Sequence, residues 1–238
     1  MLKSLQIASG KTAQIGCALL ALSFISSACL AQNLIVNGSF ELPTMNQSGD
    51  SSDNLLANWS GNTANVRTFG AYYVPQSAFS VTPPALDGKQ IAYVNNASSI
   101  SQNTGISLIS NQNYLLTAYI GRNNTSPNAL GEILLYSGGV ISQGSVVGGT
   151  LLGTSTPILT SGQYSQAFVS YNSGTVLTGG TLIVELKGLS QDQVNFESVS
   201  LFQKSSTAVP EGGAFTLIMG GAISGSLFFR NGFRRKKK

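Results

Sequence analysis

Short apolar and polar stretches alternate along most of the chain, without the three-to-four-residue spacing that is typical of amphipathic helices. Between residues 33 and 202, β-branched or aromatic runs are separated by clusters of Asn, Ser, Thr and Gly, which favour turns. This pattern predicts short β-strands. The clearest are 91–94, 114–121, 132–136, 166–171, 181–187 and 194–202, and the weaker ones are 34–36, 78–81 and 99–102.

Short strands at this spacing favour an all-β fold, and an antiparallel β-sandwich rather than a closed barrel. The region is long enough to bury a core of its own. We expect this core to contain Phe40, Trp59, Tyr93, Leu116, Phe168, Ile183, Val184 and Phe196.

The amino-terminal segment has the features of a secretory signal peptide. Two lysines precede an apolar stretch, 15–25, and small residues follow it up to Ala31. We therefore predict a signal peptide over 1–31 and export by the Sec machinery. A lipoprotein signal, the alternative, would use Cys29, but Ser26 stands where such signals have leucine. Both cysteines of the chain lie in this segment, so the mature protein would have no disulfide.

The carboxyl-terminal segment predicts a membrane helix. The apolar run 214–229 would form a helix about 24 Å long, somewhat shorter than a bilayer core of roughly 30 Å. Residues 230–238 then contain six of the 13 basic residues and would stay on the cytoplasmic side. A buried core helix is the alternative, but no polar face interrupts the run.

Charge and composition exclude several functions. Five basic and eight acidic residues between positions 32 and 208 give the exported part a net charge of −3, so we expect no nucleic-acid partner. The chain has no histidine, which excludes a Ser-His-Asp triad and histidine-bound zinc. The acidic residues fall in predicted turns and strands, where solubility explains them. We therefore predict that the protein is not an enzyme.

The tail resembles a PEP-CTERM sorting signal, also known from the carboxyl-terminal domain of ice-binding proteins. Val209, Pro210 and Glu211 match the family motif, and Gly212 departs from it because the family usually has a second proline there. The resemblance implies that an exosortase-like processing enzyme cuts near the motif, 209–213. It implies a linker over 204–208 and a sorting tail over 209–238.

The exported region, 32–203, resembles galactose-binding-like jelly rolls, which include carbohydrate-binding modules. The resemblance rests on an opening strand that ends in Asn37-Gly38-Ser39-Phe40-Glu41 and on a closing Asn195-Phe196-Glu197-Ser198-Val199. The segments 87–95 and 114–122 also match the family pattern. The resemblance implies an antiparallel jelly-roll β-sandwich.

The same resemblance implies one structural Ca²⁺ held by Glu41 and Glu197. In such sandwiches an acid of the opening strand and an acid near the closing strand share the ion with backbone carbonyls, and calcium prefers such hard oxygen ligands. The closing acid is glutamate here where the family more often has aspartate. In the alternative interpretation both acids are solvated residues at strand ends.

A ligand site is predicted at Tyr72 and Tyr73, with Arg122 and Asn123 as polar partners. Aromatic faces suit sugar rings, and a flanking glycine and proline would place the two tyrosines in a loop. The alternative is that these aromatic residues belong to the core or to strand rims.

These observations predict an exported bacterial surface protein that is not catalytic. It would be held in the inner membrane by its tail before processing, and would then reach the cell surface or the extracellular matrix. The resemblance of the tail to PEP-CTERM signals implies association with the extracellular polysaccharide of biofilms. The alternative is a purely structural surface or matrix protein without a specific ligand.

Overall fold

The computed structural model describes residues 31–45, 51–64, 68–73, 85–175 and 179–205. Within these ranges the chain forms β-strands and no helix. The strands are β1 Ser51–Asp53, β2 Ser60–Gly61, β3 Phe69–Tyr73, β4 Gln90–Val94, β5 Ser99–Ser107, β6 Gln112–Arg122, β7 Gly131–Ser137, β8 Val140–Ser142, β9 Ser145–Val147, β10 Thr150–Ser155, β11 Tyr164–Asn172, β12 Thr181–Gly188 and β13 Val194–Ser205.

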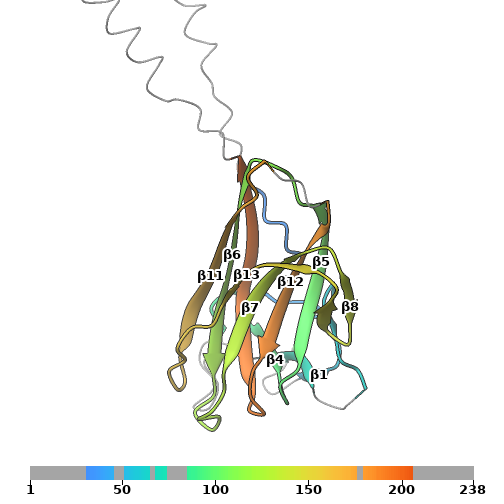
Figure 1. Ribbon diagram of the computed structural model, residues 1–238. Coiled ribbons are helices and arrows are strands. Elements are labelled where there is room, and N and C mark those ends of the chain that lie inside the picture. Colours follow the sequence, from blue (N-terminus) through green and yellow to red (C-terminus); the bar gives the residue numbers. More distant parts are fainter. Residues whose placement is uncertain (1–30, 46–50, 65–67, 74–84, 176–178, 206–238) are drawn as a thin grey trace, which may run out of the picture. The chain divides into compact units, whose positions relative to one another are not determined.

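Two antiparallel sheets contain all of these strands except β8 and β9, which form a hairpin of their own. The six-stranded sheet has the order β1-β3-β4-β13-β6-β11, and the five-stranded sheet has the order β10-β7-β12-β5-β2. Figure 1 shows β6, β13 and β11 on one side and β7, β12 and β5 on the other, with β8 beside β5. The prediction of an all-β, antiparallel sandwich is confirmed.

Strand alternation places one face of each sheet on a shared core. On β13, Val194 and Phe196 belong to this core, whereas Asn195 and Glu197 lie on the opposite face. We call the face of the six-stranded sheet that lies away from the core the outer face. Trp59 is a core residue as predicted, and its ring centroid lies 5.5 Å from that of Phe40.

One prediction about the core and one about the strands are wrong. Phe168 lies on the outer face and is 64% exposed, because the next residue, Val169, is the one that reaches the core. Residues 34–36 form no strand; the opening segment makes one isolated bridge, between Asn33 and Phe202. The remaining strands predicted within the described residues are present.

Two buried glutamine side chains attach the opening segment, 33–45, to the sheets. Gln102 accepts a hydrogen bond from the amide of Val36 (2.8 Å) and donates one to its carbonyl (2.7 Å). Gln90 donates to the carbonyls of Phe40 (2.8 Å) and Pro43 (2.9 Å) and accepts from the amide of Met45 (2.6 Å). The side-chain amides therefore satisfy backbone groups that a neighbouring strand would otherwise satisfy.

Several predictions concern residues outside the described ranges. These are the body of the signal peptide, the strand at 78–81, and the motif, apolar run and basic end of the tail. β13 continues to Ser205, into the segment predicted as a linker. Among the residues that the structure describes, no helix is long and apolar enough to cross a membrane.

Candidate functional site

The outer face is built around one row of residues that crosses five neighbouring strands. Strand register places them directly opposite one another. The row consists of Gly70 on β3, Tyr93 on β4, Asn195 on β13, Gly121 on β6 and Tyr164 on β11. Because all five lie on the same face, the two tyrosines flank the asparagine from either side.

The two glycines of this row make room for the two tyrosine rings. A Cβ atom at Gly121 would lie 2.7 Å from Cδ1 of Tyr164, and a Cβ atom at Gly70 would lie 2.9 Å from the hydroxyl of Tyr93. Each ring thus occupies the space above a neighbouring strand. For Tyr164, this means that the ring lies over β6 and extends from β11 toward β13.

Aromatic and aliphatic side chains form a wall beside the row. The rings of Tyr72 and Tyr93 have centroids 4.5 Å apart with an interplanar angle of 30°. The hydroxyl of Tyr93 donates a hydrogen bond to Oδ1 of Asp53 (2.6 Å). Ile91 is fully buried and packs with Tyr72 and Tyr164 in a cluster separate from the main core. Buried apolar and aromatic side chains therefore lie next to polar groups on this face, and Tyr72 and Tyr164 are only partly buried.

Glu197 is the central ionisable group of the outer face. It follows Asn195 by two residues on β13 and is fully buried. Burial raises the pKa of its carboxyl group to about 9, and the nearby charges of Asp87 and Glu41 act in the same direction. Backbone hydrogen bonds with Asp87 and Ser198 oppose this increase without cancelling it. Burial therefore favours the protonated, neutral form of Glu197 at neutral pH.

Two buried oxygen atoms on this face have no hydrogen-bond partner within the described residues. They are Oε2 of Glu197 and the hydroxyl oxygen of Tyr164. The Tyr164 ring is partly exposed, but its hydroxyl is buried. Burial, and then the charge of Glu197, raise the pKa of the Tyr164 phenol well above its ordinary value. Since buried polar groups are normally paired, these two atoms indicate a position where a ligand would bind.

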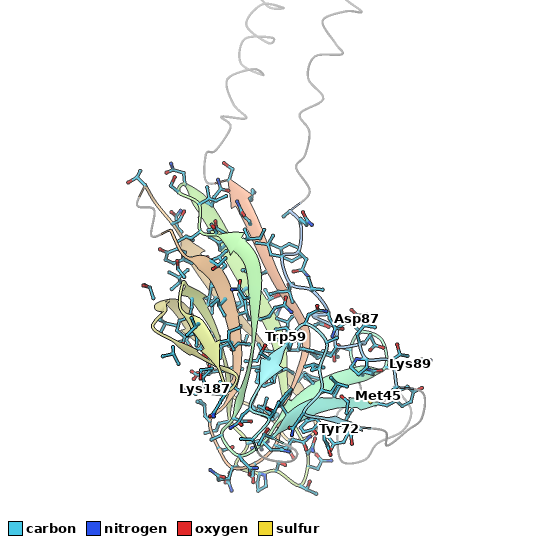
Figure 2. The ribbon with its side chains drawn as sticks, turned by 90° about the vertical axis from the view of Figure 1, so that its right-hand side faces the viewer. Met45, Trp59, Tyr72, Asp87, Lys89 and Lys187 are labelled. Carbon is cyan, nitrogen blue, oxygen red and sulfur yellow. The ribbon has the colours of Figure 1, made fainter. Side chains whose placement is uncertain are left out.

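The structure brings Glu41 and Glu197 into electrostatic contact, together with Asp87. Oε1 of Glu41 accepts hydrogen bonds from the amides of Lys89 and Gln90, both at 2.7 Å. Gly88 has φ +77°, and a Cβ atom there would lie 2.3 Å from this oxygen, so the turn requires glycine. Figure 2 shows Asp87 and Lys89 on the same side of the sandwich.

The four residues predicted to bind a ligand do not form one site. Tyr72 and Tyr73 lie in β3 and not in a loop, so their side chains point to opposite faces and Tyr73 packs on the core. Asn123 lies near the outer-face row, where its Oδ1 accepts a hydrogen bond from Asn195 (2.8 Å). Arg122 points to the other face, and its guanidinium donates to the carbonyl of Pro127. Tyr72 and Asn123 therefore lie at the outer face, whereas Tyr73 and Arg122 point away from it.

Sequence reasoning did not select Tyr164 as a site residue and did not place Asn195 at the centre of the row. Asn195 links Asn123 to Gln193, whose Nε2 donates to Asn195 Oδ1 (2.8 Å). Asn195 is one of several polar residues that alternate with apolar ones in the closing strand, so the sequence did not distinguish it. Tyr164 approaches β13 because of the register in which β11 and β13 pair with β6. The pattern of residues within a single strand does not predict this register.

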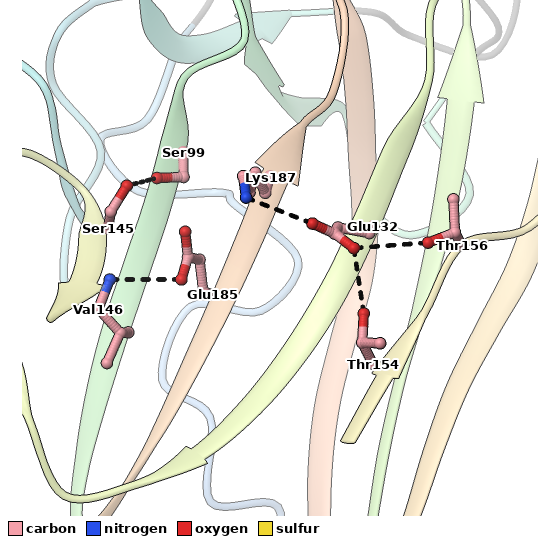
Figure 3. Close-up of polar contacts among 8 residues, drawn as sticks. All are labelled: Ser99, Glu132, Ser145, Val146, Thr154, Thr156, Glu185 and Lys187. Carbon is pink, nitrogen blue, oxygen red and sulfur yellow. Dashed lines mark hydrogen bonds and ion pairs between the residues drawn. The ribbon is translucent and has the colours of Figure 1, made fainter. Parts of the chain in front are cut away.

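A second polar cluster lies on the face of the five-stranded sheet away from the core (Figure 3). Glu132 forms an ion pair with Lys187 (3.5 Å), and Glu185 accepts a hydrogen bond from the amide of Val146 (3.3 Å). Burial, and then Glu185, raise the pKa of Tyr136 to about 12. Both carboxylates have protein partners, so this cluster is explained by attachment of the β8–β9 hairpin and the neighbouring strands.

The raised pKa of Glu197 predicts that folding stability depends on pH. The pKa is 4.5 in the unfolded chain and about 9 in the folded protein, so the folded state binds the proton more tightly between these values. The contribution of Glu197 to the free energy of unfolding is therefore complete below about pH 4.5 and is lost as the pH rises to about 9. Urea unfolding at about pH 5, 7 and 9 should show this loss in the wild type and not in Glu197→Gln. Equal slopes in the two proteins would contradict the assignment.

The carboxyl groups that interact electrostatically with Glu197 are those of Asp87 and Glu41. In the part of the chain that the structure describes, no group of three or more His, Cys, Asp or Glu side chains is arranged to hold a metal ion. Any ion at this site would thus need backbone carbonyls or water as further ligands.

Comparison with known families and structures gives one consistent result. The model of a family described as HpiC1-like, HpiC1 cyclase, matches residues 31–202. A Stig cyclase, Fisc, from Fischerella sp. TAU, crystallised with (3Z)-3-(1-methyl-2-pyrrolidinylidene)-3H-indole, is 17% identical with a TM-score of 0.62, and the alignment covers 74% of this chain and 99% of that one. A search of curated proteins found no match.

Two further structures from the same genus agree. An apo cyclase from Fischerella sp. has a TM-score of 0.61 at 17% identity and covers 75% of this chain and 98% of that chain. A cyclase from Fischerella sp. TAU in complex with 4-(1H-indol-3-yl)butan-2-one has a TM-score of 0.61 at 17% identity, covering 75% of this chain and 100% of that chain. At this identity the structures show a shared fold.

These findings correct three predictions from the sequence. The chain is not identified as a PEP-CTERM protein with a galactose-binding-like region, because the family that matches 31–202 is a different one. The prediction of a non-catalytic protein that associates with polysaccharide is wrong, since the matched family is a family of cyclases. The exclusion of enzymatic activity failed because the acids were assigned to solvated positions, whereas Glu197 is buried.

Proposed function

Because the chain belongs to the HpiC1-like cyclase family, we propose that it is an acid-catalysed cyclase with its active site on the outer face. The observation that carries this proposal is Glu197, a fully buried carboxyl group whose pKa is raised to about 9 and whose Oε2 has no partner in the described residues. A carboxylic acid that stays protonated at neutral pH can donate a proton to a bound substrate.

The reaction that such a group supports is an isomerisation. Glu197 transfers its proton to the substrate, which becomes a cation at the carbon that accepts the new bond. A nucleophilic carbon of the same molecule then attacks this position and closes the ring. Loss of a proton to the Glu197 carboxylate restores the acid. No atom is gained or lost, so product and substrate have the same mass.

The aromatic wall suits a cationic intermediate and a flat aromatic substrate. The partly buried Tyr72, whose ring packs at 30° against that of Tyr93, has an electron-rich face that attracts positive charge. The hydrogen bond from the Tyr93 hydroxyl to Asp53 adds electron density to that ring. Two of the similar Fischerella proteins were crystallised with indole compounds. We propose that the substrate of this chain is an indole with an unsaturated side chain.

The proposal is tested with the purified protein and a series of indoles that carry alkenyl side chains at the three-position. The expected product is a ring-closed isomer of unchanged mass, detected by chromatography with mass spectrometry and identified by NMR. Heat-denatured protein measures the uncatalysed reaction. Conversion no faster than with denatured protein, across the series, would overturn the proposed substrate class.

Calcium binding by Glu41 and Glu197 remains a proposal for the same site. The buried Oε2 of Glu197 is an oxygen that a cation would satisfy, and the Glu41 carboxylate lies in electrostatic contact with it. A bound Ca²⁺ would favour the ionised carboxylate and would lower the pKa of Glu197. Calcium and acid catalysis therefore require opposite protonation states of this group.

The two roles are separated by a calcium titration. Calorimetry with CaCl₂ should show binding to the wild type and loss of binding in Glu41→Gln if these two carboxylates are ligands, and bound calcium should then inhibit cyclisation. Absence of binding to the wild type would remove the calcium site and leave the acid unaffected. Glu132→Gln, which changes a carboxylate on the other sheet, is the matched control.

The predictions for the ends of the chain are kept as proposals. The sequence of residues 1–31 supports export, and the sequence of 214–229 supports attachment to a membrane. The order of the strands in the two sheets supports a jelly-roll arrangement of the sandwich.

A further inference from the structure

Strand β11 is the least protected edge of the two sheets. The other edges are short or irregular: β1 has three residues, β2 has two, and β10 shifts register between Leu151 and Gly153. β11 is nine residues long, pairs with β6 without a register shift, and contains no charged residue and no proline. Figure 1 shows it as the outermost strand, beside β6. Proteins normally interrupt such an edge with a bulge, a charge or a proline, because its free backbone groups can pair with another strand.

Backbone hydrogen bonds of β13 show which of its residues point toward β6. The amide of Leu201 donates to Oδ1 of Asn33 (3.0 Å), and its carbonyl accepts from the amide of Leu34 (2.8 Å). Both backbone groups of Leu201 are therefore directed to the opening segment and away from β6. Since this direction alternates along a strand, the backbone groups of the next residue, Phe202, point to β6, where Phe202 pairs with Leu115.

The alternation continues across β6 and fixes the direction of the backbone groups of β11. Leu116 follows a residue that points to β13, so Leu116 points to β11, where it pairs with Val169. The residue before Val169, Phe168, then directs its N–H and C=O to the free edge, and Gln166 and Ser170 do the same. Among the described residues, none outside β6 forms a backbone hydrogen bond with β11.

We propose that β11 pairs with β11 of a second copy of this chain, so that the two six-stranded sheets join into one. The antiparallel pairing is centred on Phe168, which lies in the middle of the strand and faces its own copy across the two-fold axis. Gln166 then faces Ser170 of the second copy, and Tyr164 faces Asn172. All five residues direct their N–H and C=O to the free edge, as the hydrogen-bonded pairs of an antiparallel ladder require.

The side chains at this edge favour a second copy as the partner. Phe168 is 64% exposed, and this register packs its ring against the same ring of the second copy, a kind of cross-strand pair that stabilises sheets. Ile158 is 91% exposed, and its carbonyl accepts a hydrogen bond from the hydroxyl of Ser165 (2.7 Å). Since Ser165 faces Tyr171 of the second copy, Ile158 comes close to the edge of that copy. β11 carries no charge that the pairing would bring together.

The pairing also extends the row of residues on the outer face. Tyr164 ends this row within one copy, and Asn172 of the second copy continues it, because residues directly opposite each other in a ladder point to the same face. The inference does not depend on the proposed reaction, since it rests on the direction of the backbone groups and on the composition of β11.

The oligomeric state of the full-length chain, purified in detergent, tests the proposal. Sedimentation equilibrium over a concentration series measures the Kd of the dimer. Phe168→Lys removes the aromatic pair and places like charges opposite each other at the two-fold axis, so it should raise this Kd at least about tenfold. Ser170→Pro removes an N–H that points to the free edge and none that bonds to β6, so it should raise the Kd as well.

Leu115→Lys is the matched control. Leu115 is 42% exposed on the same outer face, but it lies on the interior strand β6, so a lysine there leaves the edge of the sheet unchanged. The Kd of this variant should equal that of the wild type. Circular dichroism checks that the variants are folded, and Phe168→Lys decides the matter by itself if Ser170→Pro does not fold, because the Phe168 side chain lies away from the core.

Three results would overturn the proposal. The first is a wild type that stays monomeric at the highest concentration. The second is a Phe168→Lys protein that dimerises as tightly as the wild type, which would place the contact elsewhere in the chain. The third is equal weakening by Leu115→Lys and Phe168→Lys, which would show that the outer faces pack on one another and that the edges do not pair.

Discussion

Glu197→Gln should reduce the rate of cyclisation by at least about a hundredfold, because an amide has no acidic proton to donate. Glutamine has nearly the same size as glutamate and keeps the hydrogen-bonding oxygen near Ser198, so substrate binding should change little. The effect should therefore appear in kcat and not in KM. Wild-type activity should also fall as the pH rises through about 9, where the carboxyl group of Glu197 ionises.

The matched control for this variant is Glu132→Gln. Glu132 lies on the five-stranded sheet, where it is bonded to Lys187, Thr154 and Thr156, and its carboxylate has no part in the proposed reaction. Its activity should equal that of the wild type within experimental error. A Glu197→Gln protein that keeps a third or more of the wild-type rate would contradict the role of Glu197 as the acid.

Gln90→Leu should lower the free energy of unfolding by about 3 to 5 kcal/mol. Leucine has a side-chain volume similar to that of glutamine but lacks its two N–H donors and its acceptor oxygen. The carbonyls of Phe40 and Pro43 and the amide of Met45 therefore lose their hydrogen-bond partners in a buried region. Each unsatisfied buried group costs about 1 to 3 kcal/mol. Since Glu41 follows Phe40, the loss should also displace the carboxylate that faces Glu197.

Urea unfolding monitored by circular dichroism measures this effect. Gln166→Leu is the control, because this glutamine lies on β11 and is exposed to solvent. The control should change the free energy of unfolding by less than about 0.5 kcal/mol. A loss of under about 1 kcal/mol in Gln90→Leu would show that the opening segment is held mainly by its apolar contacts.

The sequence predicted where the strands lie better than it predicted which side chains on each face of the sheets are buried. Alternation within 194–202 identified the closing strand, and its apolar residues do face the core. The proximity of Glu41 and Glu197 was expected only from the family resemblance, and the structure places the two carboxyl groups in electrostatic contact. Local pattern was enough for the closing strand because alternation depends on a single strand.

The candidate site on the outer face could not be predicted because it depends on the register between strands. The alternation of apolar and polar residues within the strand predicts that the side chain of Glu197 points away from the core and into solvent. In the structure this side chain is fully buried. Tyr164 and Asn195 are 31 positions apart in the chain and become neighbours across β6 through Gly121. Tyr72 and Tyr73 looked like a loop pair because their flanking residues are turn-formers, whereas pairing with β4 makes them a strand.

The most direct test of this account is the pKa of Glu197 itself. The protein would be labelled with ¹³C at the carboxyl carbon of glutamate, the resonance assigned by comparison with Glu197→Gln, and its chemical shift followed from about pH 4 to about pH 10. A titration midpoint of about 9 is predicted, and a midpoint near the ordinary value of 4.5 would contradict a protonated acid on the outer face.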